Sequence, residues 1–156
     1  MSPQIPNAPY FVRRSEPSDV PAIQEILAHS PEAAAWSAAS LEQLHANNSQ
    51  SWVVEIKGEI VAFLAARIVA PEEAEILNLA VAASHRRIGA ATALLRSAIA
   101  ELTRTQIRQV HLEVRESNRA AISLYEKNGF RPTGRRPNYY RNPDEAAVLL
   151  VRELTA

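Results

Sequence analysis

The chain has 156 residues, 47% hydrophobic and 22% charged, as expected for one soluble globular domain. Its 17 Lys and Arg balance 17 Asp and Glu, so no global field would attract DNA or another polyanion. The absence of cysteine excludes disulfides, thiolate metal sites and a Cys nucleophile. No signal peptide or apolar run of ~18 residues is found, so the sequence predicts a cytoplasmic protein that does not enter a membrane.

The hydrophobic pattern predicts the element order β, α, α, β, β, β, α, β, α, β, β. Residues 1–8, polar and proline-rich, are predicted to form a flexible tail, and residues 9–156 one domain. The first predicted elements are a strand at 10–13, helices at 18–29 and 37–47, a hairpin of 52–56 with 60–64, and a strand at 75–81. A helix at 88–103, a strand at 110–115, a helix at 118–129 and strands at 130–136 and 146–153 follow. This order predicts an α/β (α+β) domain with a mixed, mostly antiparallel central sheet flanked by helices.

The turn before the long helix carries two cations, Arg86 and Arg87, where the helix dipole disfavours positive charge. A bound pyrophosphate would compensate, because free N–H groups at a helix start bind anions and Gly89 and Ala91 leave room for close approach. The alternative is that both arginines lie on a solvated loop.

A second group of residues lies further along the chain. Glu113 is on the polar face of its strand, and Tyr125 lies about two turns into the next helix, so both could reach a cleft at the end of that strand. A carboxylate and a phenol can serve as base and acid. The alternatives are a surface carboxylate paired with an arginine for Glu113 and a core aromatic for Tyr125.

Together these segments resemble the GNAT superfamily of acetyl-coenzyme A-dependent N-acetyltransferases. The motif R/Q-x-x-G-x-G/A appears as residues 86–91, and the blocks 76–81, 112–118 and 138–140 resemble the RimI-type ribosomal-protein alanine N-acetyltransferases. The resemblance covers about residues 10–154. Ala91 and Ile88 depart from the commonest residues at their positions, although Ala91 is allowed by the motif.

The resemblance implies a role for each matching residue. Leu79, Ala80 and Val81 would pair through their main chain with the pantetheine arm of acetyl-coenzyme A. Glu113 would accept the proton and Tyr125 would donate one. The remaining implied contacts are the pyrophosphate site at Arg86, Arg87, Ile88, Gly89, Ala90, Ala91 and Thr92, the cofactor contact of Asn118, and the acceptor contacts of Tyr139 and Tyr140.

The implied reaction is direct acetyl transfer in a ternary complex. The acceptor would be the N-terminal amine of a protein or peptide, such as the alanine of a ribosomal protein. A base is needed because an α-amine of pKa ~7.7–8.0 is mostly protonated at neutral pH, and the Val81 amide would stabilise the oxyanion. A lysine side chain or a small amine stays open as acceptor, and so does a coenzyme A-binding module without turnover.

Two further features carry less information. The four histidines are scattered without ligand spacing, so no metal cofactor is predicted. Residues 131–141 contain four arginines and no acid, which could guide an acidic or RNA-bound substrate or could be a solvated hairpin. Neither feature indicates the oligomeric state.

Overall fold

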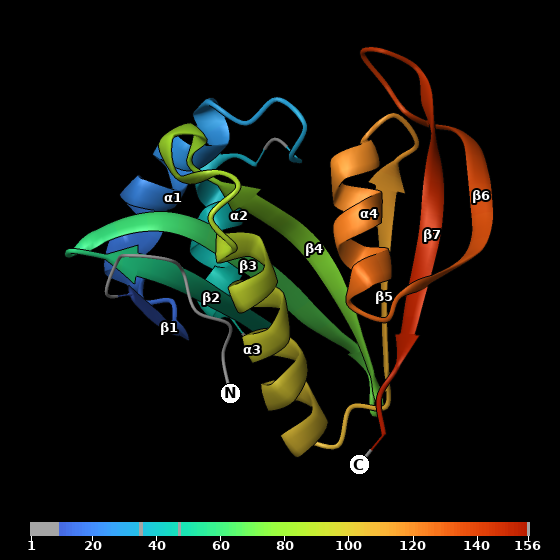
Figure 1. Ribbon diagram of the computed structural model, residues 1–156, viewed down its shortest axis with the longest axis horizontal. Coiled ribbons are helices and arrows are strands. Elements are labelled where there is room, and N and C mark those ends of the chain that lie inside the picture. Colours follow the sequence, from blue (N-terminus) through green and yellow to red (C-terminus); the bar gives the residue numbers. More distant parts are fainter. Residues whose placement is uncertain (1–9, 35, 47, 156) are drawn as a thin grey trace.

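A computed structural model describes residues 10–34, 36–46 and 48–155 (Figure 1). The predicted tail lies outside the described residues, as does Asn47, so the tail and the domain boundary at residue 9 stay predictions. The α-helices and strands follow the predicted order. They are β1 (Tyr10–Arg14), α1 (Val20–Ala28), α2 (Ala38–Glu42), β2 (Ser49–Ile56), β3 (Glu59–Ala70), β4 (Glu73–Val81), α3 (Ala90–Arg104), β5 (Gln109–Arg115), α4 (Arg119–Lys127), β6 (Arg131–Tyr140) and β7 (Glu145–Glu153).

The strands form one 7-stranded sheet in the order β1-β2-β3-β4-β5-β7-β6. Every neighbouring pair is antiparallel except β4 and β5, which are parallel and joined by α3. This architecture confirms the predicted fold class of a mixed, mostly antiparallel sheet flanked by helices. Among the described residues, no helix is long and apolar enough to cross a membrane.

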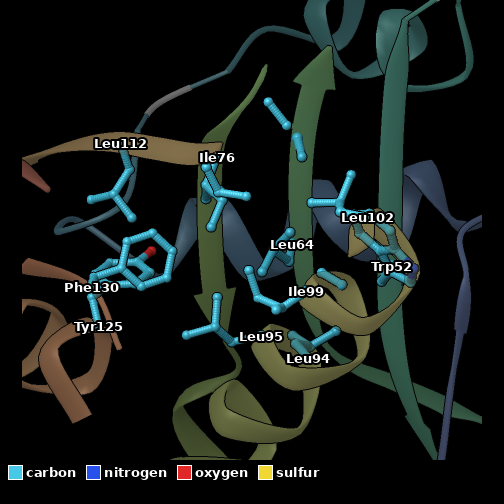
Figure 2. Close-up of a cluster of buried hydrophobic side chains, with 14 of the residues drawn as sticks. Trp52, Leu64, Ile76, Leu94, Leu95, Ile99, Leu102, Leu112, Tyr125 and Phe130 are labelled. Carbon is cyan, nitrogen blue, oxygen red and sulfur yellow. The ribbon is translucent and has the colours of Figure 1, made fainter. Parts of the chain in front are cut away.

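Two hydrophobic clusters cover the two faces of the sheet. The larger joins α3 and α4 to one face, and Figure 2 shows Leu94, Leu95 and Ile99 of α3 packed near Leu64 and Ile76 of the strands. The smaller joins α1, α2 and the 3-10 turn after α2 to the opposite face through Ile23, Ile26, Leu41 and Leu44, which pack on strand residues such as Phe63. These two faces are called the α3/α4 face and the α1/α2 face below.

Local signals account for several element ends. The β2–β3 hairpin turns at Lys57 and Gly58, whose φ angles of 51° and 79° suit a two-residue hairpin turn. Ser37 caps α2 by accepting from Ser40 N–H, and Asn118 caps α4 by accepting from Ala121 N–H. Gly129 ends the turn after α4 with φ 89°, as its left-handed position requires.

Several predicted boundaries are wrong, for example the end of β3, which is Ala70 rather than residue 64, and the end of α2, which is Glu42 rather than residue 47. The α3 helix begins at Ala90 rather than Ile88, because Gly89 is its N-cap with φ 87° and Ile88 packs on the core from the preceding loop. Strand β6 extends to Tyr140 rather than ending at Arg136. Nearly all of β6 is exposed, so no hydrophobic alternation marks its length.

Candidate active site

The parallel strands β4 and β5 pair over one short stretch and then separate. Register partners run only from Glu73 with Gln109 to Glu75 with His111, and Figure 1 shows the two strands diverging beyond them. The gap is a cleft of about 780 Å³. Its walls are residues 76–79 of β4, residues 112–115 of β5, Asn118, Ala121 and Tyr125 near or in α4, residues 31–34 after α1, and residues 139–142.

Both predicted catalytic residues line this cleft, from opposite faces of the sheet. Val110, Leu112 and Val114 of β5 point into the core of the α3/α4 face, so the alternating Glu113 points toward the α1/α2 face. Tyr125 belongs to the α3/α4 core. A molecule in the cleft could therefore meet the carboxylate on one side and the phenol on the other.

The ring of Tyr125 is buried, with 5% of the residue exposed. It contacts Phe130 edge to face at a centroid distance of 5.4 Å, and Figure 2 shows both rings beside Leu112. Its hydroxyl makes no hydrogen bond with the described residues. Burial, with a smaller effect of Tyr140, raises the pKa of the Tyr125 phenol well above its usual value, so the group stays protonated. Tyr125 is thus both a core aromatic and a free donor at the cleft.

Glu113 has a side chain only 23% exposed and contacts two residues of β6. Its Oε1 lies 3.3 Å from a guanidinium nitrogen of Arg136. It also accepts a hydrogen bond from the Tyr139 phenol, which raises the pKa of that phenol. Glu113 was predicted to be either a base at a cleft or a carboxylate paired with an arginine. In the structure it lines the cleft and is also paired with Arg136.

The two tyrosines predicted to bind the acceptor end β6 beside Glu113. Their rings meet edge to face at 5.0 Å, with Tyr139 46% exposed and Tyr140 half-buried. Burial, followed by the charges of Glu113 and Tyr139, raises the pKa of Tyr140 to about 12. Both phenols are therefore neutral donors at physiological pH.

The edge of β4 that faces the cleft offers unpaired main-chain groups. Ala82 N–H donates to Val61 C=O of β3 at 2.7 Å, so alternation directs the main-chain groups of Leu79 and Val81 toward the cleft and those of Ala80 toward β3. Asn78 Oδ1 accepts from Leu79 N–H, and Arg86 Nε donates to Val81 C=O. The groups that remain for a ligand are Leu79 C=O and Val81 N–H, so Ala80 cannot pair in the predicted way.

The loop before α3 presents backbone N–H groups, although none of residues 86–92 is among those that line the cleft. The first helical bond is from Ala93 N–H to Gly89 C=O, which leaves the amides of Ala90, Ala91 and Thr92 without helical partners. Arg87 has φ 66° and its side chain is exposed. These features fit a pyrophosphate.

The side chain of Arg86 does not point freely to that loop. One nitrogen lies 2.9 Å from Glu32 Oε1, in the segment after α1, and another donates to Val81 C=O. In this structure Glu32 supplies a charge that compensates Arg86, and the phosphate contact of Arg86 stays a prediction. Asn118 uses its Oδ1 for the α4 cap, so only its Nδ2 group is available to a ligand.

Asn78 and Arg115 are functional candidates to which the sequence had given no role. Asn78 is 5% exposed, and it donates to Ala34 C=O at 2.9 Å and accepts from Ala34 N–H at 3.3 Å. An amide inside the apolar run 76–81 is the signal that could have identified it. Arg115 lines the cleft and contacts the segment after β6.

The arginine group of residues 131–141 is paired rather than free. Each arginine has a carboxylate within 4 Å, from Glu153, Glu116, Glu113 and Asp144 respectively for Arg131, Arg135, Arg136 and Arg141. This arrangement favours the solvated hairpin over a site for RNA. Within residues 10–34, 36–46 and 48–155, no three His, Asp or Glu side chains are grouped to hold a metal ion.

Comparison with known proteins gives relatives along most of the chain. The model of the acetyltransferase (GNAT) family matches residues 17–130. A [ribosomal protein bS18]-alanine N-acetyltransferase of Escherichia coli (strain K12) is 34% identical over 138 residues, which cover 87% of this chain and 92% of the relative. An N-alpha-acetyltransferase of Sulfurisphaera tokodaii is 29% identical over 121 residues, 70% of this chain and 72% of the relative.

Solved structures share the fold. The ribosomal-protein-S18-alanine N-acetyltransferase from Escherichia coli superposes with a TM-score of 0.86 at 31% identity, covering 95% of this chain and 96% of that chain. Arabidopsis thaliana NAA60, solved in complex with acetyl-CoA, has a TM-score of 0.85 at 21% identity and covers 95% of this chain and 100% of its own. The chain therefore belongs to the GNAT family of acetyltransferases, enzymes whose acetyl donor is acetyl-CoA.

Proposed function

We propose that this enzyme acetylates the N-terminal α-amine of a protein by direct attack on acetyl-CoA, with an N-terminal alanine of a ribosomal protein as acceptor. The observation that carries the mechanism is the position of Glu113 and Tyr125 on opposite faces of one cleft between β4 and β5. The acceptor follows from the Escherichia coli relative, which is named for alanine of ribosomal protein bS18.

Glu113 acts as the base. An α-ammonium must lose a proton before its nitrogen can attack, because its pKa of ~7.7–8.0 keeps it mostly charged at neutral pH. The Glu113 carboxylate faces the α1/α2 side of the cleft, where it attracts this cation and takes the proton directly or through water. Arg136 and Tyr139 hold the carboxylate in place, and the arriving ammonium competes with them for its oxygens.

Val81 and Tyr125 serve the acetyl group and the leaving sulfur. Acetyl-CoA supplies an activated acetyl thioester. The free N–H of Val81 lies on the cleft edge of β4, where it can donate to the carbonyl oxygen as negative charge develops. The Tyr125 hydroxyl is protonated and has no described partner, so it can donate to the sulfur on the α3/α4 face.

The backbone fits the rest of the donor molecule. Leu79 C=O on the edge of β4 can accept from an extended amide chain, as in pairing with an added strand. The amides from Arg87 to Thr92 can hold the pyrophosphate, with Arg87 as the nearby cation and Asn118 Nδ2 as a donor near the thioester. Tyr139 and Tyr140 narrow the cleft where the amine enters.

The test uses the purified chain with acetyl-CoA and matched peptides. One set has a free N-terminal alanine and no lysine, and the other has a blocked N-terminus and one lysine. Mass spectrometry of the products should show acetylation of the free α-amine, with a kcat/KM at least about tenfold above that of the lysine set, because the lysine pKa of ~10.4 leaves far less neutral amine. A preference for lysine would contradict the proposed acceptor, and acetyl-CoA binding without any transfer would contradict the mechanism.

A further inference from the structure

The segment that closes the acceptor side of the cleft is held by one arginine. Residues 141–144 form the turn between β6 and β7, called here the β6–β7 turn. Arg115, the last residue of β5, donates to the main-chain oxygens of Arg141 at 3.0 Å and Pro143 at 3.1 Å. Its guanidinium also stacks on the ring of Tyr140 at 4.5 Å. One side chain thus joins a cleft strand to the turn and to an acceptor-site ring.

A carboxylate completes this arrangement. Glu145, the first residue of β7, lies 3.2 Å from Arg115 and also accepts from Ser117 N–H at 2.5 Å. The hydrogen bonds from Ser117, followed by the charge of Arg115, lower the pKa of Glu145, so the carboxylate stays ionised. Both side chains of the pair are mostly covered, with exposures of 24% for Arg115 and 17% for Glu145. The turn is therefore tied to the start of α4 as well as to β5.

The opposite wall is tied in a comparable way. Asn78 of β4 binds both main-chain groups of Ala34, in the segment after α1. Strand β4 therefore holds the segment after α1, and β5 holds the β6–β7 turn. Both segments lie beside the acceptor side of the cleft. This arrangement indicates a preformed entrance rather than a loop that orders on binding.

We propose that Arg115 is a positioning residue, which fixes the β6–β7 turn and Tyr140 in the geometry that receives the acceptor peptide. The proposal rests on the proposed function for the nature of the acceptor. Arginine suits this role because its planar fork donates in several directions and stacks on an aromatic ring, whereas a lysine ammonium is a single strongly hydrated point charge. Replacement of Arg115 should therefore weaken acceptor binding and leave acetyl-CoA binding unchanged.

The test compares Arg115→Gln and Arg115→Lys with the control Arg131→Gln. Arg131 lies on the same hairpin near its other end, and it forms an exposed ion pair with Glu153 at 3.5 Å. In Arg115→Gln the acceptor KM should rise about 10- to 100-fold, as expected for the loss of charged hydrogen bonds. The acetyl-CoA Kd of Arg115→Gln should stay within about twofold of the wild-type value. The acceptor KM of Arg115→Lys should lie between those of the wild type and Arg115→Gln, and the control should match the wild type in both constants.

Hydrogen exchange of the free proteins provides a readout that needs no acceptor. Exchange should increase at residues 139–146 in Arg115→Gln and stay unchanged in α3 and β2. If the wild type acetylates none of the peptides, the proposed acceptor is wrong, but hydrogen exchange still tests whether Arg115 fixes the β6–β7 turn. An unchanged acceptor KM, unchanged exchange at residues 139–146, or equal losses of acceptor binding, acetyl-CoA binding and thermal stability would each overturn the positioning role.

Discussion

Replacing Tyr125 by Phe separates the packing role of this residue from its proposed role as proton donor. The ring supports the core, because it is 5% exposed and packs on Phe130, and Phe preserves that packing. The hydroxyl has no partner among the described residues, so its removal breaks no hydrogen bond inside the protein. The free energy of unfolding should therefore change by no more than about 0.5 kcal/mol.

The effect on the rate should be much larger. A missing donor at the leaving sulfur should lower kcat by about 10²–10⁴-fold, the usual contribution of a general acid or base, with little change in the acetyl-CoA Kd. The assay follows release of the free thiol in steady state, and a urea titration measures stability. Tyr125→Ala serves as the contrast, because loss of the buried ring should cost about 3–5 kcal/mol. A Tyr125→Phe enzyme that keeps its rate would show that Tyr125 is only a core residue.

Three other substitutions test the base, the donor site and a distant ion pair. In Glu113→Gln the residual kcat/KM should rise with pH as more amine arrives deprotonated, while the wild-type value levels off at lower pH; identical pH profiles would mean that another group takes the proton. Gly89→Asn keeps a residue type that tolerates the φ of 87° but fills the phosphate approach, so calorimetry should show acetyl-CoA affinity reduced by at least about tenfold. Burial alone would raise the pKa of Asp19, but hydrogen bonds from Arg13 and Glu16 N–H outweigh burial and lower this pKa in the folded protein. Ionised Asp19 therefore contributes its full stabilisation at pH values above its unfolded-state pKa of ~3.9. This contribution is lost as the pH falls through the pKa of the folded state. Asp19→Asn should therefore cost about 1–2 kcal/mol at pH 7, and denaturant titration should show a smaller difference from wild type in acid; an equal difference at both pH values would contradict this.

The element order was predictable because each element carries its own periodicity. The alternation of Val110, Leu112 and Val114 predicted β5 and also directed Glu113 away from the α3/α4 core. The cap at Asn118 and the left-handed Gly129 set the ends of α4, and they place Tyr125 within it. These are short-range effects, which depend on neighbours within a few residues.

Long-range effects could not be predicted. Arg86 pairs with Glu32, a contact across 54 residues that no local pattern indicates. The separation of β4 from β5 depends on a pairing that extends only to Glu75 and His111. The register between β3 and β4 could not be predicted either. Ala65 pairs with Asn78 and Ala66 pairs with Ile76, which leaves Leu77 as a bulge.

The bulge at Leu77 explains how one strand serves both faces of the sheet. Ile76 belongs to the α3/α4 core, whereas Ala80 belongs to the α1/α2 core, although simple alternation would place both on one side. The shift directs Asn78 toward Ala34 on the α1/α2 face, and it leaves Val81 N–H on the cleft edge. Donor and acceptor can then approach the gap between the strands from different sides. In the proposed reaction the amine loses its proton to Glu113 on one face while the sulfur meets Tyr125 on the other, so direct transfer needs no acetylated side chain.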